Sequence, residues 1–118
     1  MPHTLIKTFR FEAAHMLPNA GDGHKCTSVH GHNYRVELVL QGKLAKHEGW
    51  VVDFAEVEDA WTHACFSQLD HQLLNSVIAN PTAENLAEWI YEHMHQVVIG
   101  LRQVTVWEND DSAACYKP

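Results

Sequence analysis

Apolar and polar residues alternate along two segments in the first third of the chain. Residues 4–12 form the first segment and residues 33–42 form the second. The positions that face together are Leu5, Phe9 and Phe11 in the first, with Ile6, Thr8 and Arg10 on its other side, and Tyr34, Val36, Leu38 and Leu40 in the second. Alternation of this kind predicts two strands, which we expect to pair with each other.

Apolar positions separated by three or four residues indicate two helices in the middle of the chain. The first is expected to begin after Asp53, which can cap it, and to run for about four turns. The second follows Asn80-Pro81-Thr82, with Thr82 as its cap, and is expected to end at Gly100. The apolar stripes are Phe54, Val57, Trp61, Cys65 and Leu69 in the first helix, and Leu86, Ile90, Met94 and Val97 in the second.

Two short segments after the second helix, Leu101–Glu108 and Ala113–Lys117, are interpreted as further strands. The element order is then ββααββ, an α+β pattern with a four-stranded sheet and two helices on one face. With 118 residues, 46% of them hydrophobic, we expect one domain over residues 1–118. The other sheet face and the sheet edges then need cover, which favours a homo-oligomer.

Charge and cysteine usage exclude several classes of protein. The formal net charge is −7, and it divides into six bases and three acids in residues 1–46 against two bases and twelve acids in residues 47–118. A general nucleic-acid binder would rarely have this balance. The longest apolar run, residues 97–101, is far below the roughly 20 residues of a membrane helix. Three widely spaced cysteines without a leader segment predict a protein of the reducing cytoplasm with no disulfide framework.

Histidine accounts for ten residues, and three of these have a spacing that suits a metal. His30 and His32 flank Gly31 at the start of the second strand, where positions i and i+2 point from the same face. His15 closes the first strand, so antiparallel pairing would bring it beside them. Three imidazoles with an open fourth position are typical of a catalytic zinc site, although imidazole also suits iron, nickel or copper. The alternative is a solvated strand end, because a two-histidine motif alone is weak.

Four further residues are candidates for proton chemistry or binding. Cys26 lies in a polar loop beside His24 and Lys25, where positive charge favours a thiolate; the alternative is a small buried hydrophobe. Asp70-His71 is either an acid/base pair or a polar pair at a helix end, since neighbours in a strand rarely bond each other. Glu108 ends a strand and could accept paired N–H donors of an amino-substituted heterocycle, or be merely solvated.

The remaining histidines and cysteines need no function. His93 and His95 lie near a helix C-terminus, where positive charge suits the dipole, and they do not face each other as a metal pair would. Cys65 lies on an apolar stripe and Cys115 in a strand, so we expect both to pack in the interior. The other histidines without an assigned role are His3, His47 and His63.

Together these segments resemble the 6-pyruvoyltetrahydropterin synthase family, and within it the bacterial 6-carboxy-5,6,7,8-tetrahydropterin synthases of queuosine biosynthesis. The three-residue gap between Cys26 and His30 is similar to that branch. The residues that carry the resemblance are Phe11-Glu-Ala-Ala-His15, Gly23-His-Lys-Cys26, His30-Gly-His32, Gly49-Trp-Val-Val-Asp53-Phe54, Leu69-Asp-His71, Leu74-Asn75, Asn80-Pro-Thr-Ala-Glu-Asn-Leu-Ala87 and Glu108. The resemblance implies the tunnelling fold, in which subunits join their sheets into a barrel, as a trimer that stacks into a hexamer.

The same resemblance implies roles for individual residues. His15, His30 and His32 would bind zinc, Cys26 would be the catalytic thiolate, Asp70 and His71 would form a proton relay, and Glu108 would anchor the pterin. Lys25 and His24, with Arg10, would attract the phosphates of the substrate.

The implied reaction converts 7,8-dihydroneopterin triphosphate to 6-carboxytetrahydropterin, acetaldehyde and triphosphate, with active sites between subunits. The alternatives are a pyruvoyl-type synthase on the same scaffold and a non-catalytic zinc-binding module. A zinc hydrolase is weaker, because no carboxylate base accompanies the histidines as a metalloprotease requires.

Overall fold

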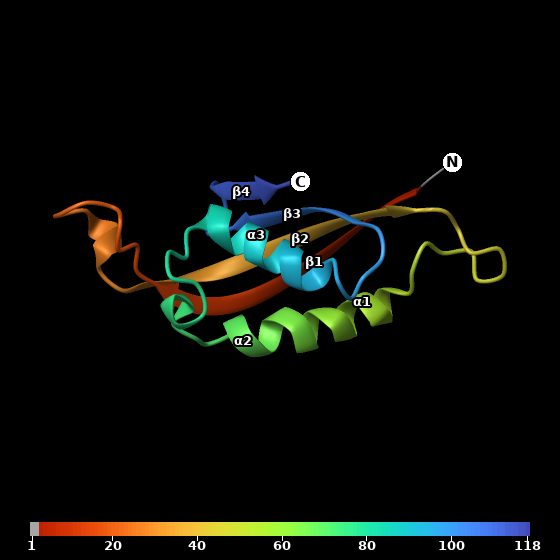
Figure 1. The fold of residues 1–118 in the computed structure, drawn as a ribbon, viewed down its shortest axis with the longest axis horizontal. Helices are drawn as coiled ribbons and strands as arrows, with labels where there is room; N and C mark the ends of the chain where they lie inside the picture. Colours follow the sequence, from red (N-terminus) through yellow and green to blue (C-terminus); the bar gives the residue numbers. More distant parts are fainter. Residues whose placement is uncertain (1–2) are drawn as a thin grey trace.

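Four antiparallel strands form one sheet in the order β1-β2-β3-β4 in the computed structural model, which describes residues 3–118 (Figure 1). The strands are β1 (His3–His15), β2 (His30–Gly42), β3 (Leu101–Trp107) and β4 (Ala113–Tyr116). The first two pair along their whole length, from His3 opposite Gly42 to His15 opposite His30. Both are longer than residues 4–12 and 33–42, the segments expected from alternation, because pairing continues to the histidines at the end of the hairpin.

One face of the sheet carries the core, as the alternation predicts. Tyr34, Val36, Leu38 and Leu40 are fully or almost fully buried along β2, and Phe11 is buried beside them on β1. The ring of Phe11 stacks on that of Tyr34 with centroids 4.8 Å apart, and Phe9 stacks on Trp61 at the same distance. Full burial of such a side chain contributes about 1.5–3 kcal/mol, so this hairpin face holds much of the stability of the fold.

The first helical segment is continuous over residues 54–69. It comprises α1 (Phe54–Trp61), a π-helical turn (Thr62–Phe66) and α2 (Ser67–Leu69), and Asp53 caps it by accepting the Ala55 N–H at 2.9 Å. Its buried positions, Val57, Trp61, Cys65 and Leu69, recur every four residues. Because four residues overshoot an α-helical turn by roughly 40°, the wider π turn keeps this stripe on the sheet. Phe54 was expected in the stripe, but it is 48% exposed, since the packed face begins one turn later at Val57.

The second helix, α3 (Ala83–Met94), is capped by Thr82, whose hydroxyl oxygen accepts the Asn85 N–H at 3.1 Å. The helix ends earlier than expected, and the chain turns over residues 95–100. Val97 is therefore exposed and Val98 takes the buried position, so the prediction of Val97 in the stripe is wrong. Gly100, expected to end the helix, instead leads into β3 with φ of +91°, where a Cβ would lie 2.5 Å from the Gln41 carbonyl oxygen.

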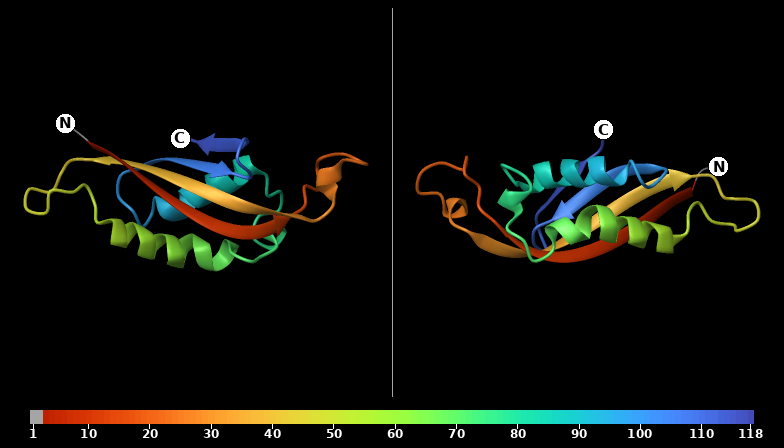
Figure 2. Two further views of the ribbon diagram at one scale, coloured as in Figure 1. Left: turned by 180° about the vertical axis from the view of Figure 1, so that it is seen from behind. Right: turned by 60° about the horizontal axis from the view of Figure 1, so that its bottom comes forward.

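The helices cover one face of the sheet and leave the opposite face bare in the described chain (Figure 2). The α+β prediction, with ββααββ order and both helices on one face, is confirmed. Cys115 was expected to pack, but it lies opposite Thr105, on the bare face, and is exposed. Within residues 3–118, no helix has the length and apolar character required to cross a membrane.

Candidate metal and catalytic site

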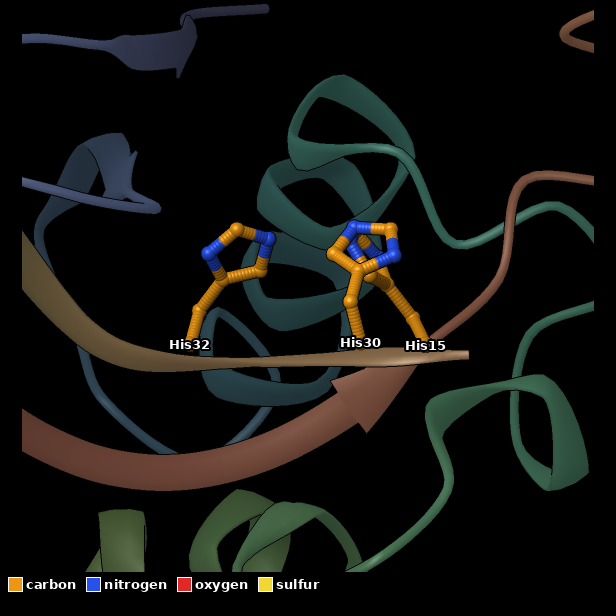
Figure 3. Close-up of side chains that lie close together, drawn as sticks. All are labelled: His15, His30 and His32. Atoms are coloured by element: carbon orange, nitrogen blue, oxygen red, sulfur yellow. The ribbon is translucent and has the colours of Figure 1, made fainter. Parts of the chain in front are cut away.

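Three histidines meet on the helix-covered face at the end of the β1–β2 hairpin (Figure 3). The register places His15 directly opposite His30 and the small Ala13 opposite His32. The ring centroids of His15 and His30 are 4.6 Å apart, and each lies 5.0 Å from the centroid of His32. One nitrogen from each ring lies within 4.8 Å of the other two. The hairpin therefore brings the predicted triad together.

Backbone carbonyls fix the tautomer of two of these rings. The Nδ1 of His15 lies 2.7 Å from the Pro81 carbonyl oxygen, and the Nδ1 of His30 lies 2.8 Å from that of Ser28. A carbonyl oxygen only accepts, so each Nδ1 donates its hydrogen and each Nε2 keeps a free lone pair. Metal-bound histidine is commonly held in this way.

Two of the three triad rings have a buried nitrogen that no group of the described chain satisfies. Among residues 3–118, the buried Nε2 atoms of His15 and His32 have no hydrogen-bond partner. Burial lowers the pKa of His32, and the neighbouring His15 and His30 lower it further, against an opposing effect of Glu108. The ring is therefore favoured in the neutral form that binds a metal. Two orphaned buried ring nitrogens beside each other fit a cation ligated by imidazole.

A cavity of about 380 Å³, the metal-site cavity, opens beside the triad. Its lining residues are His15, Leu17, Lys25, Cys26, His30, His32, Glu108 and Asn109. Cys26 lies in a short 3-10 turn (Lys25–Thr27). The backbone N–H and the backbone carbonyl of Cys26 are both hydrogen-bonded. Its N–H donates to Nδ1 of His24 at 3.0 Å, and its carbonyl accepts the Leu17 N–H at 2.7 Å. The loop thus presents a thiol beside the three imidazoles.

Glu108 reaches the same cavity from the end of β3. Its Oε1 lies 3.9 Å from the Nε2 of His15, and its backbone N–H donates to the Ser112 carbonyl at 3.1 Å. The carboxylate is a quarter exposed, so it can accept N–H donors from a molecule that enters the cavity. The cavity therefore combines a metal-ligating set, a thiol and an acceptor.

Asp70 and His71 form a hydrogen-bonded pair, with Oδ2 and Nδ1 2.7 Å apart. The pair exists because His71 has φ of +57°, which lets adjacent side chains meet as they would not in a strand. The hydrogen bond and charge of Asp70 raise the pKa of His71; desolvation opposes this rise, and the charge of Glu12 adds to it by less than desolvation takes away. Desolvation raises the pKa of Asp70, but hydrogen bonds from the Glu12 N–H and from His71 outweigh it and lower the pKa.

The Asp70–His71 pair does not line the metal-site cavity. His71 borders a different cavity of about 530 Å³, the His71 cavity, whose lining includes Glu12, Asn33 and Leu73. Asp70 lines a neighbouring cavity that shares Glu12 and Asn33. Among residues 3–118, His32 alone borders both the metal-site cavity and the His71 cavity. In one chain, the expected relay and the expected thiolate thus open onto separate spaces.

Other candidate residues also lie outside the metal-site cavity. His24 is exposed and caps the turn that carries Cys26, and Arg10 lies on the sheet face opposite the core. Sequence reasoning missed Leu17 and Asn109 as lining residues. It also missed the Pro81 and Ser28 carbonyls, because a backbone acceptor has no residue-type signal. Cys65 is buried as expected, and burial raises the pKa of its thiol to about 12.

Comparison with known proteins gives consistent matches along almost the whole chain. The family model described as 6-pyruvoyl tetrahydropterin synthase matches residues 4–118. The 6-pyruvoyl tetrahydropterin synthase of Caenorhabditis elegans superposes with a TM-score of 0.90 at 26% identity, covering 100% of this chain and 96% of that one. The hairpin, helices and sheet order described above are therefore those of the tunnelling fold.

Curated relatives carry more than one kind of name, including that of a human 6-pyruvoyl tetrahydrobiopterin synthase, which is 30% identical over 102 residues and covers 79% of this chain and 70% of that one. An Archaeoglobus fulgidus protein provisionally named a 6-carboxy-5,6,7,8-tetrahydropterin synthase is 39% identical over 105 residues, covering 88% of this chain and 86% of that one. A Synechocystis protein with that name is 35% identical over 119 residues, covering 95% and 91%. The dihydroneopterin monophosphate aldolase of Pyrococcus furiosus is 31% identical over 114 residues, covering 94% of each chain.

Proposed function

The chain belongs to the 6-pyruvoyl tetrahydropterin synthase family, and on that premise we propose that it is a zinc-dependent 6-carboxy-5,6,7,8-tetrahydropterin synthase. The reaction would convert 7,8-dihydroneopterin triphosphate and one water to 6-carboxytetrahydropterin, acetaldehyde and triphosphate, as a cytoplasmic step of queuosine biosynthesis. The observation that carries the proposal is the metal-site cavity, where Cys26 and Glu108 share one space with three converging histidine nitrogens.

Two lines of evidence favour the carboxy product. Cys26 precedes the His30-Gly-His32 motif by four positions, the spacing that resembles the 6-carboxytetrahydropterin branch. Relatives from Archaeoglobus and Synechocystis carry that name over most of this chain. The Pyrococcus aldolase is less similar, at 31% identity; its activity is a further alternative beside the pyruvoyl-type synthase.

The residues of the metal-site cavity have separate tasks in this proposal. His15, His30 and His32 would hold zinc, which supplies a Lewis acid that lowers the pKa of the substrate side-chain hydroxyls. Cys26, as a thiolate, would take a proton from the substrate side chain. Glu108 would accept N–H donors of the pterin ring, and Lys25 would attract the triphosphate with its charge.

His71, hydrogen-bonded to Asp70, would supply or take the second proton, so it must reach the same substrate. Because His71 borders a separate cavity, we propose that it acts at the metal-site cavity of a neighbouring copy in a homo-oligomer. The bare sheet face and the unpaired outer edge of β4 in the described chain support such an assembly, of which a trimer or hexamer is the expected form.

The experiment is product analysis by mass spectrometry after incubation of the zinc-loaded protein with 7,8-dihydroneopterin triphosphate. We expect 6-carboxytetrahydropterin and acetaldehyde, loss of both in Cys26→Ala, and their retention in Cys115→Ala, the exposed cysteine outside the cavity. A pyruvoyl product would contradict the proposal, as would turnover of dihydroneopterin monophosphate alone. An inactive wild type with about one zinc per chain would indicate a non-catalytic module.

A further inference from the structure

Both ring nitrogens of His71 face a carboxylate, and the two carboxylates come from different parts of the fold. Nδ1 lies 2.7 Å from Oδ2 of Asp70, its neighbour in sequence. Nε2 lies 3.6 Å from Oε2 of Glu12, on β1. These two acids are the charged groups that act on His71 among the described residues. Asp70 has a place in the proposed function, whereas Glu12 has none.

Backbone hydrogen bonds fix Glu12 relative to this ring. Its N–H donates to Oδ1 of Asp70 at 3.1 Å, and its carbonyl accepts the His71 N–H at 2.6 Å. A third bond, from the Ala14 N–H to the Gln72 carbonyl at 3.1 Å, continues the pairing along the outer edge of β1. The turn that carries His71 is thus hydrogen-bonded to the backbone of Glu12, the residue whose carboxylate faces Nε2 of His71.

This docking also accounts for the backbone of His71. It is the one residue other than glycine with positive φ in the described chain, at +57°. A residue in that region costs on the order of 1–3 kcal/mol and persists only where surrounding contacts determine it. The bonds to Glu12 and the pairing at Ala14 are such contacts, so the fold is built to hold this imidazole at the β1 edge.

We propose that Glu12 is a positioning residue for His71. The carboxylate of Glu12 attracts the Nε2–H of the His71 imidazolium and orients the ring toward the His71 cavity. The proposal rests on the proposed function, in which His71 exchanges a proton with substrate. A separation of 3.6 Å is too long for a hydrogen bond, so Glu12 orients the Nε2 proton without binding it. Transfer of the Nε2 proton to a substrate anion would leave a neutral His71 ring that still donates its Nδ1–H to Asp70.

The decisive experiment follows the ring of His71 by NMR titration in the full chain without substrate, with the signal assigned by its loss in His71→Gln. In Glu12→Gln, which keeps the backbone bonds of residue 12, we expect the titration midpoint to move to lower pH. Glu37→Gln is the matched control, because Glu37 lies on β2 opposite Thr8 and does not contact His71. An unchanged midpoint in Glu12→Gln would overturn the proposal.

A kinetic measurement separates positioning from mere stability. With His71 as proton donor, the alkaline limb of the kcat profile should move to lower pH in Glu12→Gln, and Glu12→Asp should restore part of it. The fall in kcat should be smaller than the 10²–10⁴-fold that removal of an acid/base group costs. If Glu12→Gln lowered the thermal unfolding midpoint but left the alkaline limb of the kcat profile unmoved, Glu12 would have a structural role only. An inactive wild type would refute the proposed function, while the ring titration would still decide the contact of Glu12.

Discussion

His15 and His30 lie directly opposite each other in the β1–β2 register, with ring centroids 4.6 Å apart and each Nδ1 held by a backbone carbonyl. The hairpin thus aligns two Nε2 lone pairs before any metal arrives. Pre-alignment of this kind reduces the conformational entropy that a metal must overcome on binding. The third histidine of the triad, His32, comes two residues further along the same strand face.

Removal of one histidine of the triad should weaken metal binding strongly. Loss of a group that only orients a ligand commonly costs 10–100-fold in affinity, so His30→Ala should lose about 100-fold or more. His63→Ala is the matched control, because the Nδ1 of His63 also lies 2.8 Å from a carbonyl, that of Asp59, while its ring lies outside the triad. Metal analysis after dialysis measures the effect, and near-stoichiometric zinc in His30→Ala would contradict the assignment.

The Asp70–His71 pair should stabilise the protein within a defined pH window. The pKa of His71 is raised, so its contribution is complete below the usual 6.5 and is lost as pH rises through the raised pKa. The pKa of Asp70 is lowered, so its contribution is present above the usual 3.8 and is lost as pH falls through the lowered pKa. Both contributions are therefore complete between about pH 4 and 6.5.

Asp70→Asn should move the NMR titration of His71 to lower pH by more than Glu12→Gln does, since Asp70 is the larger cause of the raised pKa. It should also flatten the pH dependence of stability below and above that window, where the two contributions are otherwise lost. If the larger shift belonged to Glu12→Gln, the assignment of Asp70 as the main partner of the imidazole would be wrong.

Cysteine reactivity should separate the three thiols. Cys65 is fully buried and burial raises the pKa of its thiol to about 12, so it should resist iodoacetamide at pH 7 in the folded protein. Cys26 is partly exposed and Cys115 is exposed in the single chain, so both should be alkylated faster than Cys65. Mass mapping of peptides after a brief reaction gives the answer, with urea-unfolded protein as the control in which all three react. Labelling of Cys65 as fast as Cys115 would show that the core is open there.

Gly100 should be the least replaceable of the glycines with positive φ. Alanine at Gly49, with φ of +78° and no atom within 4 Å of a Cβ, should cost about 1 kcal/mol through backbone strain alone. Gly100→Ala adds a Cβ 2.5 Å from the Gln41 carbonyl oxygen, so it should lower the free energy of unfolding by at least about 1 kcal/mol more. Urea denaturation compares the two variants, and equal costs would contradict the close approach at β2.

Strand alternation and the His30-Gly-His32 spacing were sufficient to predict the hairpin and the triad. Side-chain period two determines which face each histidine takes, and antiparallel pairing then brings His15 beside them. Val97 and Phe54 were misplaced because the apolar spacing gives no signal of where the packed face of a helix begins or ends. The short turn after α3 moves the buried position by one residue, to Val98.

Other parts of the site could not be predicted from residue types. The carbonyls of Pro81 and Ser28 orient two ligands, yet every residue has a carbonyl. The Asp70–His71 bond depends on a positive φ at His71, a conformation that histidine adopts only under surrounding constraint. The contact of Glu12 with His71 depends on the docking of the Asp70–His71 segment against β1. The hydrogen bond that docks it joins Glu12 to Asp70, 58 positions apart in sequence.

The stoichiometry of the products tests the central claim most directly. Zinc-loaded protein incubated with 7,8-dihydroneopterin triphosphate should release acetaldehyde and 6-carboxytetrahydropterin in equal amounts, both quantified by mass spectrometry in the same sample. Release of triphosphate with a pyruvoyl-substituted pterin and no acetaldehyde would contradict the assignment of this chain as a 6-carboxytetrahydropterin synthase.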